Sequence, residues 1–159
     1  MTINRETDEG DRPLKDVFVG FERVGAVKAI FGAKTNEVLE ETRVVLQERK
    51  GYLRVDDING KILINILYLR NGDEKHLYLD LIHELVHVRQ YMEGRELFDK
   101  RYSYVDRPTE IEAYSVAVKE AKRIGMSNEE IEDYLKVEWV TDEEFERMLT
   151  NLHLKPKGD

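Results

Sequence analysis

Apolar positions change their period several times along the chain, and each change predicts a separate element of secondary structure. Residues 1–13 are polar and charged without an apolar period, so we expect a flexible tail that buries nothing. The rest of the chain, 14–159, has the length of a single domain. Within it, the apolar stretch from Val17 to Phe31 fits neither period and is compatible with a strand or a short helix.

The next segment predicts a helix followed by a hairpin. Apolar residues recur at helical spacing over about 36–50, and a glycine follows. Two apolar runs, 52–55 and 62–69, then flank the pair Asn59-Gly60, which favours the positive φ angles of a tight turn. The second run is apolar on both faces, so we expect a strand that is packed on both sides.

The second half of the chain predicts helices. A segment of about 75–93 is apolar on nearly every side, which is typical of a helix inside a domain. A further helix is predicted over about 108–124. Two capping-box patterns, each of which opens an amphipathic helix, follow at Ser127-x-x-Glu130 and Thr141-x-x-Glu144. The elements together predict an α+β fold, with a backing helix and a small, mostly antiparallel sheet packed on the buried helix.

The composition limits the partners and the metal ligands that the protein can have. The net charge is −8, which disfavours a general nucleic-acid or anionic-membrane partner. No run approaches the roughly 20 apolar residues of a membrane span, and we expect a cytoplasmic protein. The chain has no cysteine, so a bound metal must be held by His, Asp or Glu.

Two of the four histidines lie four residues apart in the predicted buried helix, in the sequence His83-Glu84-Leu85-Val86-His87. Residues at this spacing differ by about 40° around a helix, so both imidazoles can reach one metal ion. Glu84 lies beside that position, where a general base for a water activated by the metal belongs. The alternative is a pair of hydrogen-bonded core histidines, but burying three polar groups in so apolar a helix costs free energy unless each group finds a partner.

A catalytic zinc also needs a third protein ligand. His76, near the start of the same helix, and His153, near the C-terminus, are poor candidates and are expected to be solvated. Glu110 is a better candidate because it ends a stripe of alanines on the 108–124 helix, although a carboxylate favoured by the helix dipole explains it nearly as well. Glu112 points about 200° away from Glu110 and fits a capping box with Thr109.

These residues resemble those of the gluzincin metallopeptidases, and by size the compact minigluzincins. The resemblance rests on the His83 to His87 motif and on Glu110-Ile-Glu-Ala-Tyr114, which is similar to the family's downstream Glu-x-x-Ala helix. It covers the order of elements from about 35 to 124. It implies a zincin-like fold in which His83, His87 and Glu110 bind Zn²⁺ and Glu84 acts as general base and acid.

One position departs from the family. Many gluzincins carry Asp four residues after the ligand glutamate, whereas this chain has Tyr114, whose hydroxyl would replace that carboxylate or only pack. Tyr102, Tyr104 and Tyr114 are candidates for stabilising an oxyanion, and each is also compatible with a half-buried structural tyrosine.

The sequence therefore predicts a zinc-dependent metallopeptidase that acts on peptide or protein substrates. We expect the substrate to align on an exposed strand edge, that of the 62–69 run. The alternative is a catalytically silent, zinc-stabilised scaffold that binds a partner through the helices of 127–152. The acidic tail is also a candidate inhibitory segment, through Asp8 or Glu9. The oligomeric state has no signal in the sequence.

Overall fold

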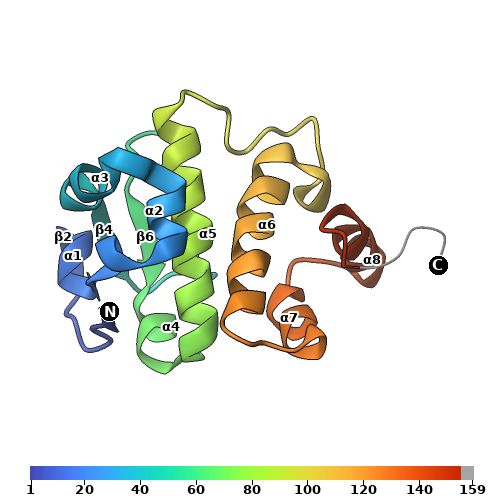
Figure 1. Ribbon diagram of the computed structural model, residues 1–159, viewed down its shortest axis with the longest axis horizontal. Coiled ribbons are helices and arrows are strands. Elements are labelled where there is room, and N and C mark those ends of the chain that lie inside the picture. Colours follow the sequence, from blue (N-terminus) through green and yellow to red (C-terminus); the bar gives the residue numbers. More distant parts are fainter. Residues whose placement is uncertain (155–159) are drawn as a thin grey trace.

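Helix α5 (Glu74–Met92) runs through the middle of the protein, with the sheet and the N-terminal helices on one side and α6 to α8 on the other (Figure 1). The structure is a computed structural model and describes residues 1–154. The other helices are α1 (Leu14–Val17), α2 (Gly25–Phe31), α3 (Thr35–Glu41), α4 (Ile66–Asn71), α6 (Pro108–Arg123), α7 (Asn128–Leu135) and α8 (Asp142–Asn151). Short 3-10 turns span Phe21–Arg23, Gly32–Lys34 and Tyr104–Asp106.

The strands form two sheets. Their bounds are β1 (Thr2–Ile3), β2 (Gly10–Pro13), β3 (Phe18–Val19), β4 (Arg43–Gln47), β5 (Leu53–Val55) and β6 (Ile62–Asn65). The larger sheet has the order β2-β4-β6-β5, with β4 and β6 parallel and the two outer pairs antiparallel. Strands β1 and β3 form a separate antiparallel pair. The predicted α+β fold with a mostly antiparallel sheet is confirmed.

The helices of the second half agree with the prediction. Helices α5 and α6 occupy the predicted segments, and both capping boxes form, with Ser127 opening α7 and Thr141 opening α8. In each box the hydroxyl accepts the backbone N–H of the glutamate three residues later, and that glutamate accepts the N–H of the cap residue. The capping boxes could be predicted from the sequence because they depend only on residues within one helical turn. No helix of the described part of the chain is long and apolar enough to cross a membrane.

The predicted helix over 36–50 is wrong beyond its first half. Helix α3 ends at Glu41, and strand β4 begins at Arg43. Val44 and Leu46 are buried while Arg43 and Gln47 are exposed, so the second half follows the period of a strand. The same few apolar residues fit both periods, and only pairing of β4 with β2 and β6 decides between them.

The hairpin is confirmed, but its second strand is shorter than predicted. Strands β5 and β6 pair antiparallel around a loop in which Gly60 has a positive φ of 74°. Strand β6 ends at Asn65, whose side chain accepts the N–H of Leu67 and caps α4. Strand β6 lies between β4 and β5, so it has no exposed edge. The expectation that a substrate aligns on the edge of the 62–69 run is therefore wrong.

The N-terminal segment is part of the fold, and the expectation of a tail is wrong. Strand β2 pairs with β4, and Asp11 forms ion pairs of 2.6 Å with Arg43 and with Lys61. Arg5 donates to the backbone oxygen of Leu69 at 2.8 Å. These contacts are made by backbone and charged groups, which leave no apolar period. Strand β2 lies at the sheet edge opposite β5.

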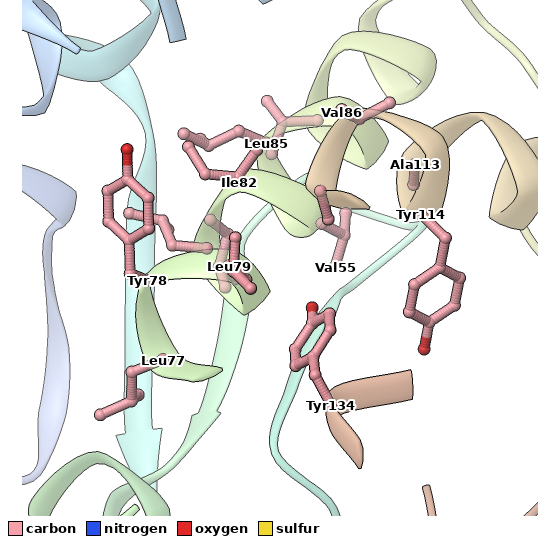
Figure 2. Packing of buried hydrophobic residues seen from close by; sticks show 14 of the residues in the cluster. Val55, Leu77, Tyr78, Leu79, Ile82, Leu85, Val86, Ala113, Tyr114 and Tyr134 are labelled. Carbon is pink, nitrogen blue, oxygen red and sulfur yellow. The ribbon is translucent and has the colours of Figure 1, made fainter. Parts of the chain in front are cut away.

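The core is continuous around α5. Every residue from Leu81 to Val88 is buried, as expected for a helix that is apolar on nearly all sides. Helix α6 lays Ala113, Ala117 and Ala121, all fully buried, against this helix, and Figure 2 shows Ala113 beside α5. Small side chains let the two helix axes approach closely, which brings the N-terminal turn of α6 next to the histidine turn of α5.

Candidate metal centre

Three side-chain atoms from α5 and α6 converge on one point. The Nε2 atoms of His83 and His87 lie 3.1 Å apart, and each lies 3.0 Å from Oε1 of Glu110. All three side chains are buried. Three ligand atoms bound tetrahedrally to one zinc at about 2.0 to 2.1 Å would lie about 3.3 Å from one another. The observed triangle matches that spacing within a few tenths of an ångström, so these residues fit a divalent ion.

The hydrogen bonds of Gln90 orient the His87 ring. The side-chain nitrogen of Gln90 donates to the backbone oxygen of Thr109 at 3.1 Å and to Glu112 at 2.9 Å, so the side-chain oxygen of Gln90 must face His87. That oxygen lies 2.7 Å from Nδ1 of His87, and it can only accept. Nδ1 of His87 therefore carries a proton, and in the neutral ring the lone pair is on Nε2, toward the triangle.

Glu112 belongs to this supporting network and not to a capping box. It accepts from Arg89 at 2.8 Å and from Arg95 at 3.0 Å in addition to Gln90. The hydroxyl of Thr109 instead donates to the backbone oxygen of Leu97 at 2.8 Å, so the predicted capping box between Thr109 and Glu112 is wrong. Glu112 is not part of the triangle, although it also reaches α5 through Arg89 and Gln90.

Glu84 lies beside the triangle without joining it. Its Oε1 accepts the backbone N–H of Val55 at 3.2 Å, and its Oε2 lies 3.8 Å from Nε2 of His83. The carboxyl group is buried with 7% of the residue exposed. Burial raises the pKa of Glu84 to about 8. This carboxyl group is thus held next to the candidate metal position and is able to exchange a proton near neutral pH.

The three converging groups also shift each other's protonation. Burial tends to raise the pKa of Glu110, but hydrogen bonds from the two imidazoles hold it well below its ordinary value. Burial lowers the pKa of His83, whereas the Glu110 carboxylate outweighs burial at His87 and raises its pKa to about 9. These shifts favour an ionised Glu110 carboxylate beside a protonated imidazole, and a bound cation would replace that proton.

The remaining histidines and the tyrosines occupy distinct places. His76 packs edge-on against Tyr134, and His153 is exposed, so neither reaches the triangle. The Tyr114 ring packs on His83 with 4.1 Å between ring centroids, and its hydroxyl lies 2.5 Å from that of Tyr104. Tyr104 lines the cavity in front of the triangle, whereas Tyr102 is 43% exposed and is not part of that lining.

Tyr114 does not hydrogen-bond His83 or His87 in the described residues. Nδ1 of His83 is a buried side-chain nitrogen without a hydrogen-bond partner in residues 1–154, and its ring is positioned by packing. The ring of His87 is instead held by Gln90, through the contact at its Nδ1. The sequence reasoning missed Gln90, although its spacing of three residues from His87 on one helix face was a usable signal.

A cavity of about 540 Å³ opens in front of the triangle and is bordered by strand β5. Tyr52 and Asp56 bond to β6 through their backbones, so by the alternation of antiparallel strands the backbone groups of Leu53 and Val55 point away from β6. The bond from Val55 N–H to Glu84 confirms that direction. The exposed strand edge next to the candidate site is therefore β5.

The chain matches no known protein family, no curated protein and no solved structure. The class of site therefore rests on geometry: a buried His-His-Glu group that could hold a metal ion, on two packed helices of an α+β domain.

Proposed function

We propose that the protein is a zinc-dependent metallopeptidase of the gluzincin type. The observation that carries the proposal is the convergence of His83, His87 and Glu110 within 3.1 Å, next to a buried Glu84 that is not part of the triangle. A site that only binds a metal does not need this fourth group. The cavity and the outward backbone groups of Leu53 in the edge strand β5 supply room and bonding partners for an extended peptide.

Each residue of the site has a separate role in the proposed hydrolysis. His83, His87 and Glu110 would hold Zn²⁺, which would supply Lewis acidity to activate a water molecule near neutral pH and to polarise a carbonyl group. Glu84 accepts a proton from the attacking water and returns it to the leaving amine, and its bond from Val55 keeps the carboxylate in position. The backbone of Leu53 pairs with the substrate strand. Tyr104, at the cavity wall, is the tyrosine placed best to donate to a developing oxyanion.

The Glu84→Gln variant tests this function. Zinc-loaded wild type and variant are incubated with a tryptic digest of a proteome, and new peptide ends are identified by mass spectrometry. We expect both proteins to carry one zinc per chain, and we expect the variant to lose at least about 100-fold in cleavage rate, because general-base catalysis contributes about 10² to 10⁴-fold.

Two results would contradict the proposal. Wild type that binds zinc but produces no new peptide ends would be a zinc-stabilised scaffold, and the enzyme would be rejected. Purified protein that takes up no zinc in elemental analysis, with its melting temperature unchanged by chelator, would reject the metal site itself.

A further inference from the structure

Positive charge gathers around the cavity of a chain that is otherwise acidic. The chain has a net charge of −8, yet the cavity lining includes Arg49, Lys50, Arg54, Lys100 and Arg107. The only carboxylates in the same lining are Glu84 and Glu110, which face the histidines. A divalent cation at the triangle would add further positive charge. The charged side chains that line the cavity are therefore five cations against two carboxylates, whereas the whole chain is acidic.

These cations are not engaged in ion pairs with other side chains of the described fold. Within residues 1–154, none of the five forms an ion pair, whereas Arg43, Arg89, Arg95 and Arg123 all do. The guanidinium of Arg54 lies 4.4 Å from the Phe98 ring centroid, and Arg107 donates to the backbone oxygen of Asp99 at 3.2 Å. Neither contact is an ion pair, although the Asp99 carboxylate lies near enough to Arg107 to interact with its charge.

The cations come from two segments of the chain that border the cavity. Arg49, Lys50 and Arg54 belong to β5 and the loop before it, which is the wall where a substrate strand would lie. Lys100 and Arg107 belong to the connection between α5 and α6, which forms another wall. A peptide bound along β5 would therefore meet positive charge along the strand and across from it.

We propose that the cleft selects peptide segments that carry Asp or Glu close to the bond placed at the metal centre. This inference rests on the proposed peptidase function for the position of the bond, but its charge preference is measured by binding alone. Extended main-chain pairing on β5 recognises no particular side chain, so the flanking cations are the groups that distinguish one peptide from another.

The test uses zinc-loaded Glu84→Gln protein, which binds without turnover, and three fluorescein-labelled dodecapeptides. The peptides share their apolar residues and carry four Glu, four Gln or four Lys at the other positions. In fluorescence anisotropy at 50 mM salt, we expect the Glu peptide to bind at least tenfold more tightly than the Gln peptide and the Lys peptide to bind weakest. The preference should shrink at 0.5 M salt because exposed charges are screened.

Charge reversals locate the effect. The pair Arg54→Glu and Lys100→Glu should abolish the preference for the Glu peptide. The matched control, Lys119→Glu with Lys122→Glu, changes the net charge equally at exposed positions of α6 outside the cavity lining, and it should retain the preference. Equal binding of the three peptides, or equal loss in both double variants, would overturn the inference. A labelled single-stranded oligonucleotide that binds as tightly as the Glu peptide would also overturn it.

The outcomes separate this inference from the proposed function. Wild type that cleaves the three peptides at equal rates would be a peptidase without the acidic preference. Preferential binding of the Glu peptide, without cleavage of any peptide by wild type, would keep the charge preference and reject the peptidase.

Discussion

The Gln90→Met variant tests whether a residue outside the metal triangle controls its affinity for zinc. Methionine has a similar volume, so the variant keeps the packing of a fully buried position. It removes the acceptor 2.7 Å from Nδ1 of His87, which sets the tautomer and the direction of that ring. Loss of such an outer contact costs about 10 to 100-fold in metal affinity, or about 1.4 to 2.7 kcal/mol of binding free energy.

The same substitution should also lower stability. It leaves the buried N–H of His87 without its partner, whereas the backbone oxygen of Thr109 keeps its place in helix α6, and one unpaired buried group costs about 1 to 3 kcal/mol. We therefore expect the free energy of unfolding of the zinc-free protein to fall by about 1 to 3 kcal/mol. At this chain length, that corresponds to a decrease in melting temperature of about 2 to 12 °C.

The assay is a competition titration against a chromophoric zinc chelator at pH 7.5, with urea unfolding measured in parallel. Thr109→Val is the matched control, because it removes a buried hydrogen bond of 2.8 Å to Leu97 without touching His87. It should lose about 1 kcal/mol of stability and keep its zinc affinity. The reasoning is refuted if Gln90→Met binds zinc within twofold of wild type, or if Thr109→Val weakens zinc binding equally.

Three further predictions concern the site and its support. Glu110→Ala should lower zinc affinity more than any outer-contact variant, whereas Glu112→Ala should have little effect; calorimetric zinc titration would expose the reverse order. Burial raises the pKa of Asp80 from 3.8 to about 6, so the wild-type protein loses stability as pH rises through that range. In urea titrations, Asp80→Asn should therefore gain up to about 3 kcal/mol of unfolding free energy relative to wild type between pH 4 and 7. A difference that does not change with pH would contradict this. Gly60→Ala should cost at least about 1 to 2 kcal/mol in the same assay, because φ is +74° and the added Cβ would lie 2.6 Å from the Tyr91 ring; an unchanged midpoint would refute the clash.

Local spacing in the sequence was enough to predict the core of the candidate site. An α-helix has 3.6 residues per turn, so His83 and His87 lie on the same face of the helix and Glu84 lies beside that face. The alanine stripe of α6 indicated which face would pack on α5, and that face carries Glu110. Both inferences hold because the period of a helix is a property of neighbouring residues.

Tertiary structure alone decided which strand lies at the edge of the sheet and which residues surround the candidate metal site. Strand β4 follows an apolar pattern that suits a helix equally well, and strand order depends on pairing between segments far apart in the chain. Strand β2 is held by backbone and ion-pair contacts that leave no apolar signal. The cations of the cleft come from two separate segments, around β5 and between α5 and α6. Their gathering is a long-range effect of folding, which a one-dimensional pattern of hydrophobic and charged residues does not carry.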